Sequence, residues 1–228
     1  MRAAVALLLL LSPVALGKKP APPPQPELAV RWSHGAPEHA AVFATVYAAA
    51  ADRALYVASR LPEGTPWVVV ADLDETLIDN SQYQLDVTGV GFTPESWKLW
   101  EQKATATPLP GAVHLVSLIH AAGGQLAYIS NRTEVEPTLK VLQQHGLWED
   151  DDRLCLKVEG SNKAPRRESV RTGVGACAWE GQRPVVVLYL GDQMGDFPAE
   201  GEVPSDGLTP WGYHWFMLPN PMYGDWAR

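Results

Sequence analysis

Two aspartates, Asp72 and Asp74, follow directly after a short apolar run and are separated by a single residue. The run, residues 68–71, is rich in β-branched side chains, as is typical of a strand buried on both faces of a parallel sheet. Alternate residues of an extended chain point to the same side, about 6–7 Å apart. We therefore expect two neighbouring carboxylates at the carboxyl end of a core strand, where open α/β sheets bind their ligands.

Two such carboxylates repel each other by about 4 kcal/mol when they lie about 4 Å apart. A divalent cation relieves this repulsion, and a set of oxygen ligands favours Mg²⁺ or a similar hard ion. The same pattern also fits a strand that ends in an acidic, solvated turn with no chemistry of its own. The later strands of the chain favour the first interpretation.

Hydroxyl, amide, ammonium and carboxylate side chains follow the later apolar runs. They belong to Ser130, Asn131, Lys163, Asp192 and Asp196. A hydroxyl and a lysine suit a phosphate group, and further carboxylates suit a metal ion. A single aspartate after a strand is common, but three strand ends with complementary chemistry indicate a site for a phosphorylated ligand and a metal.

Strands and helices alternate along the chain. Strands are predicted at residues 68–71, 125–129, 154–157, 185–190 and 214–218, and helices at 37–59, 111–122, 134–145 and 164–172. This alternation predicts an α/β fold, a three-layer parallel sheet of the Rossmann-like kind. Residues 80–110 interrupt it with a glycine-rich bend and a short helix that starts near Thr93, and we interpret them as a small cap over the strand ends.

The order of these motifs resembles the haloacid dehalogenase superfamily of phosphohydrolases. In detail it is similar to the class C acid phosphatases, a family that includes the bacterial outer-membrane lipoprotein 5′-nucleotidases. The resemblance covers about residues 30–226 and is carried by residues 72–81, Pro110-Gly-Ala, Ser130-Asn-Arg132, Lys163-x-x-Arg166 and Leu218 to Trp226. It implies a phosphatase domain over residues 28–228 with the fold of that superfamily.

The resemblance also implies roles for the individual residues. Asp72 is the nucleophile that forms an aspartyl-phosphate, and Asp74 is the general acid for the leaving alcohol and then the base for the hydrolytic water. The phosphate-binding residues are Ser130, Asn131 and Lys163. The Mg²⁺ ligands are Asp72, the main-chain carbonyl of Asp74, Asp192 and, at the outer edge of the metal site, Asp196.

Substrate recognition beyond the phosphate is assigned to aromatic residues by the same resemblance. Tyr223 is expected to stack on a nucleobase, with either Tyr83 or Trp32 on the other face of the base. The chain departs from the family at Gly195, where an acid is expected, and in the short segment between residues 197 and 215. These departures leave the outer surroundings of the metal and the substrate preference open.

The charge of the chain narrows the class of partner. The formal net charge is −8, and acidic residues are spread along the sequence without a basic block. Proteins that bind DNA or RNA need a stripe of lysine and arginine to follow the phosphate backbone. We therefore expect no nucleic-acid polymer as a partner, but a small phosphorylated metabolite such as a nucleoside monophosphate.

The N-terminus has the pattern of an export signal. Residues 1–17 contain Arg2, an apolar core and a small-residue cleavage site, and residues 18–27 form a proline-rich tether. The apolar core is too short to span a bilayer comfortably, although an uncleaved anchor is the alternative. Since no cysteine lies near the cleavage site, we expect an exported protein, periplasmic or secreted, without a stable membrane anchor.

Cys155 and Cys177 are the two cysteines of the chain. An oxidising compartment permits a disulfide between them, but the geometry that a disulfide requires cannot be tested in a sequence. Their spacing does not match a structural zinc site.

Together these patterns predict an exported, Mg²⁺-dependent phosphomonoesterase that hydrolyses nucleoside 5′-monophosphates. One alternative is a broad-specificity acid phosphatase or phosphotransferase without a nucleotide preference. Another is a catalytically silent protein of the same fold that binds a phosphorylated ligand. The presence of both Asp72 and Asp74 favours an enzyme.

Overall fold

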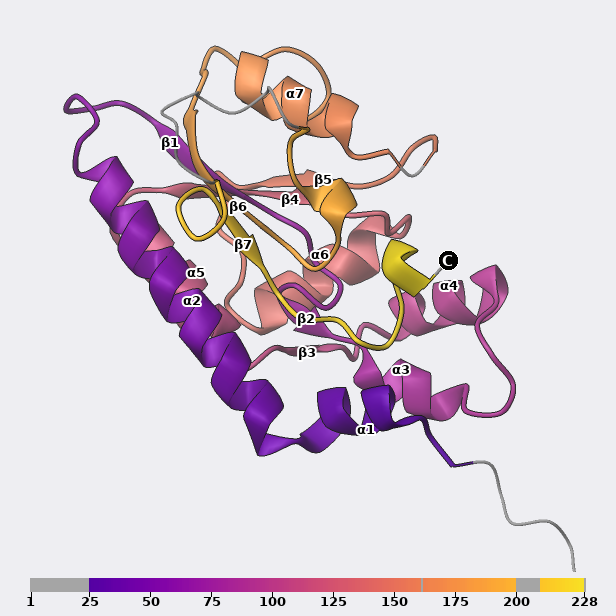
Figure 1. The fold of residues 1–228 in the computed structure, drawn as a ribbon. Coiled ribbons are helices and arrows are strands. Elements are labelled where there is room, and N and C mark those ends of the chain that lie inside the picture. The colour runs from indigo at the N-terminus through magenta and orange to yellow at the C-terminus, as the bar shows by residue number, and fades with distance from the viewer. Residues whose placement is uncertain (1–24, 161, 200–209, 228) are drawn as a thin grey trace, which may run out of the picture.

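A five-stranded parallel sheet forms the centre of the molecule (Figure 1). The computed structural model describes residues 25–160, 162–199 and 210–227, so the predicted signal segment and most of the predicted tether lie outside the described residues. The strands, in spatial order, are β5 (Arg153–Cys155), β4 (Gln125–Ile129), β1 (Trp67–Ala71), β6 (Val185–Gly191) and β7 (Trp215–Met217). The strand that precedes the paired aspartates, β1, therefore lies in the middle of the sheet.

Helices cover both faces of this sheet. Three of them lie on one face and α7 lies on the other (Figure 1). Their bounds are α2 (Pro37–Ala58), α5 (Ala112–Ala121), α6 (Val135–Gln144) and α7 (Ala164–Thr172). The predicted α/β architecture of three layers with a parallel sheet is confirmed.

The side chains of β1 alternate between two apolar cores. Val69 and Ala71 belong to the larger core beneath α2 and α5, whereas Val68 and Val70 belong to the smaller core beneath α7. Every residue of β1 is buried. Because a polar side chain in this strand would enter a core on either side, the apolar run continues unbroken until the strand ends.

The long helix α2 packs across the sheet beside α5. It starts at Pro37, whose fixed φ suits the first turn, and buries Phe43, Tyr47 and Ala50 in the larger core. By length and composition it is the one helix of the described residues that could cross a membrane. The packing of these buried side chains against the sheet is that of a core helix.

A small unit is inserted between β1 and α5, over residues 78–108. It contains β2 (Ile78–Asp79), α3 (Ser81–Asp86), α4 (Pro94–Lys103) and β3 (Thr107–Pro108). β2 pairs with β3 in an antiparallel manner, so the insertion begins and ends at the same place. A capping box between Thr93 and Ser96 starts α4.

Two further segments adjoin this insertion. The N-terminal helix α1 (Leu28–Gly35) packs against α3, and His34 Nδ1 lies 3.0 Å from Ser81 Oγ. At the other end of the chain, the short 3₁₀ helix η2 (Asp225–Ala227) lines the same pocket as Trp97 of α4.

Cys155, the last residue of β5, forms a disulfide with Cys177, which follows α7. Their Cα atoms are 5.7 Å apart, within the usual range for a disulfide. Both cysteines are buried in the smaller core. The bond therefore ties the end of α7 to the edge of the sheet.

Candidate active site

The predicted site residues meet at the carboxyl ends of three neighbouring strands. Asp72 follows β1, Ser130 follows β4 and Asp192 follows β6. Since β4 and β6 both pair with β1 in parallel, the three strand ends lie at one edge of the sheet. The backbone N–H of Asp72 still donates to the carbonyl of Leu190 at 3.0 Å, so the sheet holds the main chain up to this residue.

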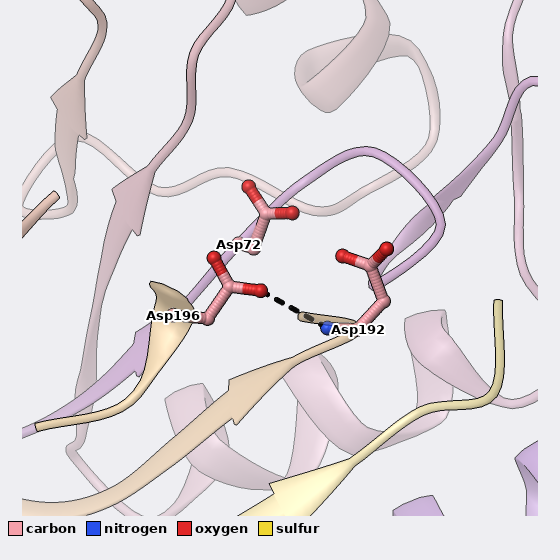
Figure 2. Close-up of side chains that lie close together, drawn as sticks. All are labelled: Asp72, Asp192 and Asp196. Carbon is pink, nitrogen blue, oxygen red and sulfur yellow. Dashed lines mark hydrogen bonds between the residues drawn. The ribbon is translucent and has the colours of Figure 1, made fainter. Parts of the chain in front are cut away.

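Three carboxylates converge at this edge. Asp72, Asp192 and Asp196 each present one oxygen atom, and these three atoms lie within 4.8 Å of one another (Figure 2). All three residues are buried. Asp196 comes from the short 3₁₀ helix η1 (Met194–Asp196), which turns back toward the end of β6.

Backbone hydrogen bonds orient Asp196. Its Oδ2 accepts from the N–H groups of Asp192, at 3.1 Å, and Gln193, at 2.9 Å. The side chain lies directly over Gly191, where an added Cβ would come 2.3 Å from the Cβ of Asp196. The absence of a side chain at residue 191 therefore makes room for the third carboxylate.

Lys163 crosses between two of the carboxylates. Its Nζ lies 2.5 Å from Asp72 Oδ1 and 2.6 Å from Asp196 Oδ1. Burial lowers the pKa of Lys163, but the two carboxylates outweigh that effect and raise the pKa above its usual value. The ammonium group therefore stays charged at every physiological pH.

Lys163 does not neutralise the group of acids. When all three carboxylates are ionised, the ammonium of Lys163 leaves a net charge of −2 within this group of four buried side chains. Burial and the neighbouring carboxylates raise the pKa of Asp72, and burial followed by the charge of Asp196 raises the pKa of Asp192 to about 6. A divalent cation held by these oxygens would balance the charge, so the residues present fit a metal such as Mg²⁺.

Two residues from distant segments fix Asp192. Thr76 Oγ1 donates to its Oδ1 at 3.3 Å, and Asn220 Nδ2 donates to its Oδ2 at 2.8 Å. Thr76 is itself held by α2, because the hydroxyl of Tyr47 donates to the Thr76 carbonyl at 2.6 Å. The helix on the face of the sheet thus supports the turn that follows Asp72 and Asp74.

Asp74 stands apart from the three converging carboxylates. Its Oδ1 accepts from Arg132 and Asn80, and its Oδ2 lies 3.5 Å from the hydroxyl of Ser130. The turn that carries it is tight, with Glu75 in the left-handed region at φ 58°. The two lead aspartates therefore occupy different surroundings although only Leu73 separates them.

Asn131 lies at the rim of the site. Its Oδ1 accepts from Arg166 Nη2 at 2.6 Å, and Arg166 Nη1 also donates to the main-chain carbonyls of Ser130 and Cys155. Arg166 therefore links the loop after β4 to α7, the helix whose N-cap is Lys163. The side chain of Arg166 therefore holds the loop of Ser130 and Asn131 against the helix that begins at Lys163, so the predicted phosphate-binding residues of both segments lie together.

A pocket of about 540 Å³ opens in front of Asp72, Asp74 and Lys163. Its outer wall is formed by the cap and the C-terminal segment. The residues of that wall are Gln84, Phe92, Trp97, Met222, Tyr223, Gly224, Asp225 and Ala227, and Gln193, which follows β6, also lines the pocket. Tyr223 thus lines the same pocket as Asp72, Asp74 and Lys163.

The two proposed stacking partners of Tyr223 do not line this pocket. Tyr83 is 2% exposed, packs against Trp97 and Trp100, and its hydroxyl lies 2.8 Å from Ser96 Oγ. Trp32 instead lines an apolar hollow with Pro219 and Trp226. The aromatic residues of the cap that do line this pocket are Trp97 and Phe92.

Sequence reasoning alone does not find several residues of this site. They are Trp97 and Phe92 in the pocket wall, and Arg132, Asn80, Thr76 and Asn220 around the carboxylates. Thr76, Asn80, Arg132 and Asn220 all lie within motifs that carry the family resemblance, and a charged or amide residue a few positions after a strand is the available signal for Arg132 and Asn220. Trp97 and Trp100 lie at helical spacing, which favours packing within the cap. Spacing alone does not tell which face of α4 meets the pocket, so it does not single out Trp97.

Known proteins share this fold. The family model described as HAD superfamily, subfamily IIIB (Acid phosphatase), matches residues 25–226. The class C acid phosphatase from Bacillus anthracis with tungstate bound has a TM-score of 0.74 at 28% identity, covering 87% of this chain and 84% of that chain. A second structure of the class C acid phosphatase from Bacillus anthracis has the same TM-score and coverage at 29% identity.

A parallel sheet with acids at its strand ends and a family match over nearly the whole chain define a phosphatase of the haloacid dehalogenase superfamily. The chain belongs to subfamily IIIB of that superfamily, the acid phosphatases. It is a phosphomonoesterase, and the expected enzyme class is confirmed.

Proposed function

We propose that this enzyme is an exported, Mg²⁺-dependent phosphatase that hydrolyses nucleoside 5′-monophosphates through an aspartyl-phosphate on Asp72. The observation that carries the proposal is the arrangement of Asp72 and Asp74. One lies against Lys163 among the converging carboxylates, and the other is held separately at the pocket. The two carboxylates are therefore suited to different tasks, one as nucleophile and one as acid and base.

In the first step a carboxylate oxygen of Asp72 forms a bond to phosphorus as the ester bond between phosphorus and the leaving oxygen breaks. Asp74 gives its proton to that leaving oxygen. In the second step a water molecule attacks phosphorus and Asp74 takes its proton. The bond between Asp72 and phosphorus then breaks, which releases inorganic phosphate and restores the Asp72 carboxylate and the protonated Asp74.

An anionic nucleophile approaches an anionic phosphate only when positive charge offsets the repulsion. Lys163, 2.5 Å from Asp72, supplies one such charge, and the buried hydroxyl of Ser130 supplies a donor to a phosphoryl oxygen. Asp72, Asp192 and Asp196 would hold the Mg²⁺ ion, together with the main-chain carbonyl of Asp74. When bound, the ion supplies further positive charge beside the phosphate.

The composition of the pocket supports a phosphomonoester whose leaving alcohol carries an aromatic base. Lys163 is the one cationic side chain among the described residues that line it. Among these described residues a second phosphate would therefore find no further cationic partner, whereas Tyr223 and Trp97 offer aromatic faces for a base. Base stacking on aromatic side chains typically contributes about 1–3 kcal/mol per base.

Export is supported by the pattern of residues 1–17 and by the disulfide between Cys155 and Cys177, since disulfides persist in oxidising compartments. N-terminal sequencing of the mature protein from the periplasm or the medium tests it. A new N-terminus near residue 18 is expected. An intact Met1 in the cytosol would contradict the proposal.

A panel of phosphomonoesters tests the activity. The purified enzyme is assayed on 5′-AMP, 3′-AMP, ADP, glycerol phosphate and p-nitrophenyl phosphate, before and after removal of metal with a chelator. We expect the highest kcat/KM on 5′-AMP, loss of turnover on chelation and recovery with Mg²⁺. Equal kcat/KM on all monoesters would favour the broad-specificity phosphatase, and full turnover in metal-free protein would contradict the metal requirement.

A further inference from the structure

Arg132 is a buried arginine beside the proposed general acid. It lies in the loop after β4 and is 1% exposed, among the most completely buried large side chains of the described residues. Burying a guanidinium group is unfavourable unless its partners satisfy its charge and its N–H groups. The partners of Arg132 therefore indicate why this position holds an arginine.

Three donors converge on one oxygen of Asp74. Nε and Nη2 of Arg132 lie 2.9 and 2.8 Å from Oδ1, and Nδ2 of Asn80 lies 2.9 Å from the same atom. The other oxygen, Oδ2, has one hydrogen-bond partner within the described part of the chain, the hydroxyl of Ser130 at 3.5 Å. An oxygen that already accepts three hydrogen bonds is poorly placed to exchange a proton, so Oδ2 is the oxygen available for the reaction.

We propose that Arg132 is a positioning residue for the leaving-group step, which holds Oδ1 of Asp74 so that Oδ2 faces the leaving oxygen of the substrate. This proposal rests on the proposed function of Asp74 as general acid. The proton on Oδ2 passes to the leaving oxygen as its bond to phosphorus breaks. Oδ2 then takes a proton from the water that releases the phosphate from Asp72.

The same guanidinium group joins Asp74 to the cap. Nη2 of Arg132 donates to Asn80 Oδ1 at 3.0 Å, and that oxygen also accepts from Trp100 Nε1 at 2.8 Å. The centre of the guanidinium lies 5.8 Å from the ring centroid of Trp97, which lines the substrate pocket. The acid and the wall that contacts the leaving group therefore share one support.

The main chain of Arg132 is fixed as well. Its N–H donates to Ser130 Oγ at 3.2 Å, and its carbonyl accepts from the N–H of Lys157 at 3.1 Å. Just beyond, Glu101 of α4 accepts from the N–H groups of Thr133 and Glu134. A side chain anchored in this way can hold a carboxylate in one orientation, which is the requirement for efficient proton transfer.

The test compares a poor leaving group with a good one in the holoenzyme. The variants are Arg132→Lys, Asp74→Asn and the double variant, assayed for kcat and KM with Mg²⁺ on 5′-AMP and p-nitrophenyl phosphate. For Arg132→Lys we expect kcat on 5′-AMP to fall about 100-fold and kcat on p-nitrophenyl phosphate less than about tenfold, because nitrophenolate leaves without an acid. KM should change little on either ester.

The double variant shows whether Arg132 acts through Asp74. If it does, Arg132→Lys should lower kcat on 5′-AMP by no more than about twofold once Asp74 is already Asn. Arg153→Lys is the matched control, because Arg153 lies on the neighbouring strand β5 and packs on Trp179, away from the pocket. Arg153→Lys should lower kcat only slightly, and by the same factor on both esters.

Several outcomes would overturn the proposal. Equal losses on both esters in folded Arg132→Lys, or a full additional loss in the double variant, would show that Arg132 does not act through Asp74. If the loss of kcat in Asp74→Asn depends on the leaving group and the loss in Arg132→Lys does not, only the proposed role of Arg132 is contradicted. If Asp74→Asn loses kcat equally on both esters, the proposed function of Asp74 as general acid is contradicted as well. Should Arg132→Lys not fold by thermal melting, Asn80→Ala removes the third donor to Oδ1 and must show the same leaving-group dependence.

Discussion

Gly191 and Asp196 pack so closely that a Cβ on residue 191 would lie 2.3 Å from the Cβ of Asp196. Contacts this short require one of the two residues to move. Gly191 is the last residue of a central strand, and Asp196 is held by two backbone N–H groups and by Lys163. The carboxylate, and not the strand, is therefore expected to give way.

Gly191→Ala should consequently weaken metal binding. We expect at least a tenfold rise in the Mg²⁺ concentration needed for half-maximal turnover, in line with changes that disturb the surroundings of metal ligands. The measurement is a titration of metal-free enzyme with Mg²⁺. Gly195→Ala is the control, because a Cβ there meets nothing within 4 Å. Equal Mg²⁺ requirements in the two variants would contradict the prediction.

Tyr223→Ala should weaken the binding of substrates that carry a base and leave the binding of substrates without a base nearly unchanged. Tyr223 lines the pocket between Met222 and Gly224, and the neighbouring prolines 219 and 221 restrict the main chain before it. Loss of stacking worth about 1–3 kcal/mol would raise KM for 5′-AMP about tenfold or more. KM for glycerol phosphate should stay nearly unchanged.

Trp97→Ala provides a second measurement of the same recognition, since Trp97 lies in the cap and also lines the pocket. Tyr83→Phe is the control, because Tyr83 is buried behind the pocket wall. It should leave the ratio of the two KM values unchanged. If Tyr223→Ala and Trp97→Ala raise KM equally for 5′-AMP and glycerol phosphate, aromatic recognition of a base is not the function of this wall.

Loss of the disulfide should reduce stability. The two cysteines are 22 residues apart in the sequence, and closing a loop of this length typically stabilises a folded protein by about 3 kcal/mol. The Cys155→Ser, Cys177→Ser double variant should show that decrease in the free energy of unfolding in urea. The oxidised and reduced wild-type proteins provide the comparison, and the reduced wild type should match the double variant. Equal unfolding midpoints for all three would contradict the prediction.

His120 should make stability depend on pH. Burial, the largest effect, lowers its pKa, but the hydrogen bond to Asp152 together with the charges of Asp152 and Glu149 raises the pKa above the ordinary 6.5. A group whose pKa is raised on folding contributes stability that is fully present below its unfolded pKa. That contribution is lost as the pH rises through the higher folded value.

His120→Gln retains a donor for Asp152 but carries no charge. The wild type should therefore be more stable than this variant at pH 5.5, and the difference should shrink by pH 8.5. Urea unfolding at several pH values measures it, with His114→Gln on the same helix α5 as the control. A constant difference between wild type and His120→Gln across that range would show that the charge of His120 plays no part.

The sequence by itself determined the class of fold and the positions of the acids. Each strand of a parallel sheet buried on both faces must be apolar throughout, so β1 and β6 are readable as continuous runs. Polar residues directly after such runs must meet at one edge of the sheet, because parallel strands end on the same side. The order of residues along the chain is therefore enough to place Asp72, Ser130 and Asp192 together.

Elements that depend on contacts between distant segments were decided only by the tertiary structure. The six-residue helix α3 is too short to show a helical period, and the eight residues of α1 are held by their packing against α3. The pairing of Cys155 with Cys177 likewise depends on where α7 lies relative to β5.

The same limit applies to the pocket. Tyr83 and Trp97 are both aromatic residues of the cap, and only the packing of α3 against α4 buries the former and turns the latter toward the pocket. Arg132 is visible as part of a motif, but its burial and its hold on one oxygen of Asp74 come from the cap lying over the strand ends. The local sequence pattern determines which residues can do the chemistry, because the residues at a strand end adjoin that strand in the sequence. Which oxygen or ring faces the substrate is set by side-chain packing between segments distant in the sequence.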